Sequence, residues 1–194
     1  MDSQAASPAA FFPTKTNDQM PHSILNLTDL VSYCTLSPIR CAAFAEAASV
    51  CLESQEHQSG TRISVSGNYN TGFYLTWTTL DDNTKSSYIL EEAVEDGAYG
   101  LAILVIRQLT PYKVIKQSFR GTGFDYWLGE HDDFPPFQEK ARLEVSGILK
   151  GTKSQVNQRL KEKLIQTRKS DNFNLPAYVI IIEFSNPQIK IKKR

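Results

Sequence analysis

The sequence predicts an α/β fold in which a central mixed sheet of about four to six strands is packed between helices. Two segments, 89–108 and about 152–168, carry apolar residues at helical spacing. Three extended segments lie between them, and a continuous β-branched run, 178–184, follows the second helix. The element order from residue 89 is therefore helix, three strands, helix and strand. A length of 194 residues suits a single domain of this kind.

The two ends of the chain have compositions that differ from the middle. Residues 1–22 combine proline with small polar residues and have too few large apolar groups to fold independently. We expect a flexible tail there, although Phe11 and Phe12 could dock elsewhere. Residues 23–187 are expected to form one α/β domain, and residues 188–194 to form a basic C-terminal tail.

A helix and a hairpin are expected before the long helix. Ser37-Pro38 is a typical N-cap and first-turn pair, and an alanine-rich run continues to about Glu56. Ile63–Gly67 and Phe73–Leu80 alternate as strands do and are separated by an asparagine- and glycine-containing turn. We expect this helix and hairpin to extend the sheet.

The segment 89–108 is predicted to be a long packed helix. Its apolar stripe consists of Val94, Ala98, Leu101 and Val105. Gly97 and Gly100 lower the helical propensity, but they permit another element to approach closely.

The second half of the chain supplies the remaining elements of the sheet. Extended segments are predicted at Tyr112–Arg120, Phe124–Leu128 and Ala141–Ile148. A capping sequence that starts at Gly151 introduces the helix that runs to about Arg168. The apolar run 178–184 is typical of a strand that is covered on both faces.

Charge and cysteine content limit the classes of function. The chain has 21 basic and 21 acidic residues, but the part from Gly151 to Arg194 carries a formal charge of about +7. No stretch reaches the roughly 20 apolar residues of a membrane helix. Cys34, Cys41 and Cys51 lack paired spacing, so we expect buried reduced thiols and a cytoplasmic protein.

Strand alternation brings two acids into consideration. Asp125 and Trp127 lie on one face of their segment, opposite Phe124, Tyr126 and Leu128. Arg142, Glu144 and Ser146 share one face of theirs. If the two strands are neighbours, Asp125 and Glu144 can converge. Two close carboxylates repel each other unless a proton or a divalent cation such as Mg²⁺ lies between them. The alternative is a pair of solvated strand carboxylates.

The order of elements and two short motifs resemble a known family. Gly121-Thr-Gly-Phe-Asp125 and Leu143-Glu144-Val-Ser146, placed between the two helices, resemble the PD-(D/E)XK nuclease superfamily. The resemblance covers about residues 89–185 and implies a restriction-endonuclease-like core of order α-β-β-β-α-β.

The resemblance also implies roles for individual residues. Asp125 and Glu144, with the carbonyl of Val145, match the positions that hold Mg²⁺ in that family. Glu95, or Glu91 one turn earlier, matches the acid that the first helix often contributes.

The sequence departs from the family at one catalytic position. Ser146 stands where the family motif has lysine, and a neutral hydroxyl cannot stabilise the charge that develops on a phosphate. A cation could come instead from Arg142 on the same face or from Lys116 on the preceding strand. The following helix offers Lys153, Arg159 and Lys163. Each of these cations also fits a solvated surface position.

These observations leave two main functional interpretations. The first is a divergent metal-dependent nuclease, or a catalytically degenerate relative, in which Lys153, Arg159 and Lys163 face the phosphates of DNA or RNA. The second is a non-catalytic interaction subunit of a larger protein assembly. No sequence motif supports a third interpretation, a small-molecule enzyme of another type. No strand interleaves basic and aromatic residues, so the sequence does not predict a stacking platform for single strands.

Overall fold

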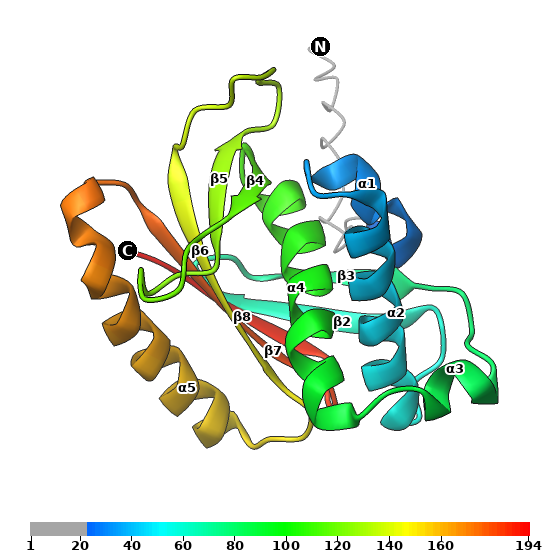
Figure 1. Ribbon diagram of the computed structural model, residues 1–194. Helices are drawn as coiled ribbons and strands as arrows, with labels where there is room; N and C mark the ends of the chain where they lie inside the picture. Colours follow the sequence, from blue (N-terminus) through cyan, green and yellow to red (C-terminus); the bar gives the residue numbers. More distant parts are fainter. Residues whose placement is uncertain (1–22) are drawn as a thin grey trace, which may run out of the picture.

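A computed structural model describes residues 23–194 of the chain (Figure 1). The tail predicted at 1–22, with its two phenylalanines, lies outside the described residues. The strands are β1 (Ile24–Asn26), β2 (Thr61–Gly67), β3 (Thr71–Thr76), β4 (Tyr112–Gln117), β5 (Tyr126–Glu130), β6 (Ala141–Ile148), β7 (Ala177–Glu183) and β8 (Gln188–Lys193). The helices are η1 (Leu27–Asp29), α1 (Leu30–Tyr33), α2 (Pro38–Ser54), α3 (Asp82–Ser86), α4 (Leu90–Leu109), α5 (Lys153–Gln166) and η2 (Thr167–Phe173).

The strands form one mixed eight-stranded sheet in the order β1-β3-β2-β8-β7-β6-β5-β4. Helices α2 and α4 pack together, and α4 covers β6 and β7. Helix α5 packs against β6 and β7 from the other side, so the sheet is sandwiched between layers of helices (Figure 1). The predicted α/β class is confirmed. The sheet is larger than expected because the described chain adds two short strands, β1 and β8, to it.

Local sequence explains where the two flanking helices begin. The Ser37 hydroxyl accepts a hydrogen bond from the Arg40 amide at 3.3 Å and caps α2. Helix α5 begins with a capping box, in which Thr152 and Gln155 each bond the backbone amide of the other. Both helices were predicted, and their observed ends differ from the prediction by only a few residues.

The segment that carries the candidate site follows the predicted order. Strands β4, β5 and β6 are antiparallel neighbours, and β7 runs parallel to β6 after α5 has crossed the sheet. Tyr126 pairs with Leu143, and Glu144 pairs with Val179. Strand β5 begins at Tyr126, two residues later than predicted, which leaves Asp125 just before the strand.

The prediction of a C-terminal tail at 188–194 is wrong. Gln188–Lys193 forms β8, an internal strand that pairs with β2 on one side and with β7 on the other. Ile189 and Ile191 are completely buried, and the alternating lysines leave them on one face. The lysine-rich composition hides a short amphipathic strand, because only two apolar residues are needed at period two.

The three cysteines lie in the packed layer of the first helices. Cys34, Cys41 and Cys51 are buried free thiols, as predicted, and the Sγ atoms of Cys34 and Cys41 lie 3.4 Å apart. In the part of the chain described by the structure, no helix has both the length and the apolar character needed to cross a bilayer.

Close contact between α2 and α4 depends on two glycines. A Cβ atom on Gly97 would lie 2.9 Å from the Cα of Ala48, and one on Gly100 would lie 2.9 Å from the carbonyl oxygen of Phe44. Both contacts are with backbone atoms, which cannot move aside alone. The close packing predicted for these glycines is confirmed.

We therefore expect Gly97→Ala to destabilise the protein by about 1 to 3 kcal/mol, because overpacking outweighs the better helical propensity of alanine. Gln108→Ala is the control, since Gln108 is exposed on the same helix. The urea-unfolding midpoint of each variant measures the effect. A Gly97→Ala variant as stable as the parent would show that α2 and α4 are not held this close.

Candidate functional site

The candidate site lies where β5 leaves β6. The Asp125 amide donates to the Leu143 carbonyl at 2.8 Å, and the Asp125 Oδ2 accepts from the Val145 amide at 2.8 Å. The side chain of Asp125 therefore takes the place of a β5 backbone carbonyl and accepts the next hydrogen bond from β6. Its carboxylate is fixed against β6 beside Glu144, as strand alternation predicted.

Glu144 is completely buried beneath α5. Its Oε1 accepts hydrogen bonds from the Lys163 ammonium at 2.5 Å and from the Gln166 amide at 2.9 Å. Its Oε2 is buried and has no hydrogen-bond partner among the described residues. Buried carboxylate oxygens are normally satisfied, so this oxygen is one of the few unpartnered buried polar atoms of the described residues.

The two carboxyl groups have perturbed acidity. Burial raises the pKa of Glu144 to about 7, with the negative charge of Asp125 adding to the effect and the hydrogen bond from Lys163 opposing it. Burial also raises the pKa of Asp125, against the lowering effect of the Val145 amide. Both carboxyl groups are therefore disposed to share a proton or a cation.

A cavity of about 300 Å³ lies between α4 and α5 and is lined by Asp125, whereas Glu144 is fully buried behind its wall. Glu91 and Glu95 line it from α4, Asp125 and Ser146 from the sheet, and Arg159 and Lys163 from α5. Gly147 allows α4 to approach at this height, since a Cβ atom there would lie 2.4 Å from the carbonyl oxygen of Val94.

Helix α5 supplies the positive charge that the strand motif lacks. The Ser146 hydroxyl accepts a hydrogen bond from the Arg159 guanidinium at 2.9 Å. Lys163, one turn later, reaches Glu144. Two further candidate cations do not line the cavity. Lys116, on β4, pairs with Glu139, and Lys153 is exposed at the start of α5.

Glu95 lies on the wall of the cavity. Its Oε1 accepts from the Tyr99 hydroxyl at 2.7 Å. Within residues 23–194 no three histidine, cysteine or acidic side chains are grouped closely enough to hold a metal ion. Glu91 and Glu95 line the cavity from α4, and Asp125 lines it from the sheet.

Arg142 shares the face of Glu144, as predicted, but it does not line the cavity. Its guanidinium is 4% exposed and donates to the carbonyls of Thr167 and Leu175 and to the hydroxyl of Ser170. It therefore ties the C-terminal end of α5 and the following turn to the sheet. Assigning Arg142 to the site was wrong, because residues two apart on a strand lie beneath different parts of a crossing helix.

Sequence reasoning also missed two side chains of the site, Tyr99 and Gln166. Gln166 lies three residues after Lys163, which places both on the same face of α5. That spacing could have indicated Gln166 once Lys163 was chosen. Tyr99 lies one turn after Glu95 and could have been found in the same way.

The residues present suit a hard divalent cation. Mg²⁺ and Mn²⁺ prefer oxygen ligands. The oxygen atoms present are the unpartnered Oε2 of Glu144, the carboxylate of Asp125 and the backbone carbonyl of Val145. Two acids whose pKa values are raised by burial would both ionise more readily beside such an ion.

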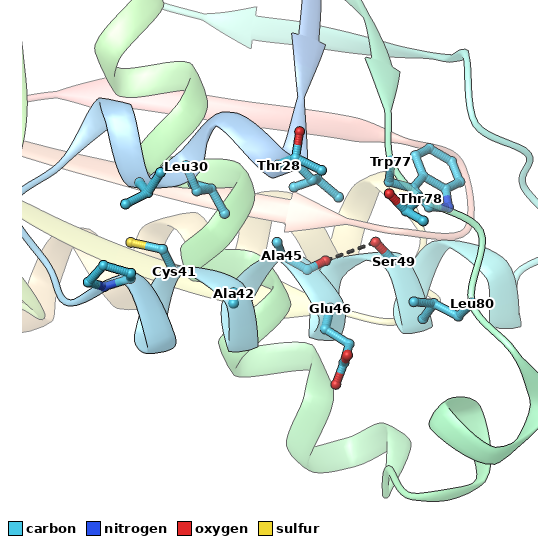
Figure 2. Close-up of a pocket in the computed structure, with 13 residues that line it drawn as sticks. Thr28, Leu30, Cys41, Ala42, Ala45, Glu46, Ser49, Trp77, Thr78 and Leu80 are labelled. Carbon is cyan, nitrogen blue, oxygen red and sulfur yellow. Dashed lines mark hydrogen bonds between the residues drawn. The ribbon is translucent and has the colours of Figure 1, made fainter.

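A second cavity, of about 430 Å³, lies on the other side of α2 (Figure 2). It is mainly apolar and is bounded by α2, by the η1–α1 segment and by Trp77 to Leu80. The Ser49 hydroxyl, one of its few polar groups, is bonded to the Ala45 carbonyl at 2.9 Å. No set of charged groups converges there, so the carboxylate cavity is the better candidate for chemistry.

Glu144 and Glu183 are two fully buried strand glutamates that should affect stability in opposite ways. Burial opposes ionisation of Glu183 as well, but hydrogen bonds from Ser185 and from the Asn186 amide outweigh it and lower the pKa of Glu183. Ionised Glu144 is costly in the folded state, whereas ionised Glu183 is stabilising.

As pH rises from the ordinary glutamate pKa to about 7, the free energy of unfolding of the parent falls, because buried Glu144 has to ionise. Glu144→Gln has no such group, so between about pH 5 and pH 8 its free energy of unfolding should rise by about 1 to 3 kcal/mol relative to that of the parent. Glu183→Gln should be less stable than the parent at neutral pH, with a deficit that shrinks as pH falls below the ordinary pKa. Urea unfolding from about pH 3 to about pH 8 measures both. Parallel profiles for the two variants would contradict the assignment.

Comparison with models of protein families, with curated proteins and with solved structures found no match to this chain.

Proposed function

We propose that this chain is a metal-dependent phosphodiesterase of the nuclease class that acts on DNA or RNA. The observation that carries the proposal is the half-buried Asp125 on the wall of an open cavity, with the fully buried Glu144 next to it and paired to Lys163. Buried, mutually perturbed titratable groups in a cavity are typical of functional sites.

The path of the chain supports this assignment. The order α4-β4-β5-β6-α5-β7, with three antiparallel strands and a parallel fourth, agrees with the restriction-endonuclease-like core that the sequence motifs imply. Asp125 precedes the second of these strands and Glu144 lies on the third, which are the motif positions. Fold agreement alone does not establish activity, so the argument depends on the site.

A divalent cation would be held by Asp125, Glu144 and the carbonyl of Val145, and when bound it would activate water and polarise the scissile phosphate. Lys163 replaces the missing motif lysine: its ammonium, already directed to Glu144, would stabilise negative charge on the phosphate. Arg159, positioned by Ser146, would bind a neighbouring phosphate oxygen. Glu95, oriented by Tyr99, would accept a hydrogen bond from water on the opposite wall.

We expect Mn²⁺- or Mg²⁺-dependent cleavage of labelled DNA or RNA that falls at least about 100-fold in Asp125→Asn and in Lys163→Met, because each removes a charge that stabilises the transition state. The asparagine can keep the hydrogen bond from the Val145 amide, so folding is preserved. Lys161→Met is the control, since Lys161 is exposed on the same helix.

Cleavage that persists in Asp125→Asn would contradict the assignment, as would the absence of cleavage at every Mn²⁺ and Mg²⁺ concentration.

A non-catalytic interaction subunit is the second candidate, and the apolar cavity beside α2 favours it (Figure 2). Apolar cavities of this size are typical of binding sites for small ligands or peptide segments. In that case Asp125→Asn would leave partner binding unchanged, whereas a charge introduced at Ala45 on the wall of the apolar cavity would abolish it.

A further inference from the structure

The turn between β4 and β5 carries the most exposed aromatic side chain near the candidate site. Phe119 is 84% exposed, and Arg120 beside it is also exposed. The turn lies next to the site, because the Ser118 amide donates to the carbonyl oxygen of Asp125 at 2.7 Å. A single exposed ring is common on protein surfaces, so the inference depends on the aromatic and cationic side chains that surround it.

The turn is held in a defined conformation. The hydroxyls of Ser118 and Thr122 are bonded to each other at 2.7 Å, and Thr122 also donates to the Phe119 carbonyl. Gly123 has a φ of +83°, and a Cβ atom there would lie 2.3 Å from the carbonyl oxygen of Gln166 on α5. The turn therefore rests on the end of α5 that holds Glu144, and Phe119 projects from a fixed base.

Further aromatic rings lie near this turn, of which Phe124 and Trp127 are buried and Phe173 is exposed. The ring centroids of Phe124 and Trp127 lie 4.7 Å apart, and those of Trp127 and Phe173 lie 5.0 Å apart. Phe173 is 42% exposed, and the Lys116 ammonium lies 5.7 Å from the centroid of the Trp127 ring. One exposed ring, Phe173, and one cation, Lys116, therefore contact this buried aromatic cluster.

The exposed charges of the surface are predominantly positive. Arg120 and Lys169 are exposed, and Lys116 is exposed but paired with Glu139. Lys169 lies against the turn, with its Cβ 3.2 Å from the position of a Cβ atom on Gly123. The neighbouring acid Asp171 is paired with Arg194 at 2.7 Å. The exposed cations suit a polyanion such as a phosphate backbone, and the exposed aromatic rings suit the flat faces of other rings.

We infer that Lys116, Phe119, Arg120, Lys169 and Phe173 form a binding surface for unpaired nucleotides, with Phe119 stacked on a base and the cations on the flanking phosphates. Paired bases inside a duplex hide their faces, so a ring between two bases needs an unpaired strand. The inference rests on the proposed function and deepens it: the substrate is a single strand, or a duplex with a single-stranded extension, that passes the carboxylate pair.

Binding of a fluorescent oligonucleotide of about 12 nucleotides, measured by anisotropy in EDTA, tests the surface separately from cleavage. The parent should bind the single strand more tightly than the blunt duplex of the same sequence. Phe119→Ala should weaken single-strand binding by about 5- to 100-fold and leave duplex binding unchanged, whereas Phe119→Trp should retain it. Phe134→Ala is the matched control, because Phe134 is also 84% exposed but lies after β5, at its other end.

Equal single-strand binding by Phe119→Ala and the parent would overturn the inference, as would an equal loss in Phe134→Ala. The outcome is separable from that of the proposed function. Single-strand binding that depends on Phe119, with no cleavage in Mn²⁺, refutes the enzyme and supports the surface. Mn²⁺-dependent cleavage that is insensitive to Phe119→Ala on every substrate supports the enzyme and refutes the surface.

Discussion

The ion pair between Lys163 and Glu144 is the constraint on which the arrangement of the site depends. A carboxylate with no exposed surface needs a charge partner, and the ammonium 2.5 Å away is on a helix that crosses the sheet. Together with the packing of Val156 and Leu160 on Val179 and Ile181, this contact holds α5 over β6 and β7. It thereby places Arg159 against Ser146 one turn earlier and opens the cavity toward α4.

The second constraint is that the pairing of β5 with β6 covers only the first half of β6. Because β5 begins opposite Leu143, the later half of β6 has no strand neighbour on that side, and Asp125 fills the first vacant position with its side chain. The helix α4 covers the remainder, where Gly147 permits close approach. The acids meet because backbone pairing stops at this point, and the same stop creates the turn that carries Phe119.

Much of this arrangement could be predicted from the sequence, since strand alternation has a fixed period. Asp125, Glu144 and Ser146 were placed correctly relative to one another by counting residues. The choice of Lys163 from several cations, and the structural role of Arg142, depend on where α5 crosses the strands, which no local pattern encodes. Strand β8 was missed because two isoleucines between lysines resemble a charged tail until neighbouring strands are known.

Calorimetric titration with Mn²⁺ in buffers of different ionisation enthalpy tests the central claim most directly, since it counts the protons released on binding. Because the pKa of Glu144 is about 7, the parent should release about one proton per ion at about pH 6 and almost none above about pH 8. Asp125→Asn should bind far more weakly. Equal Mn²⁺ binding by the parent and Asp125→Asn, or proton release that does not change with pH, would contradict the account.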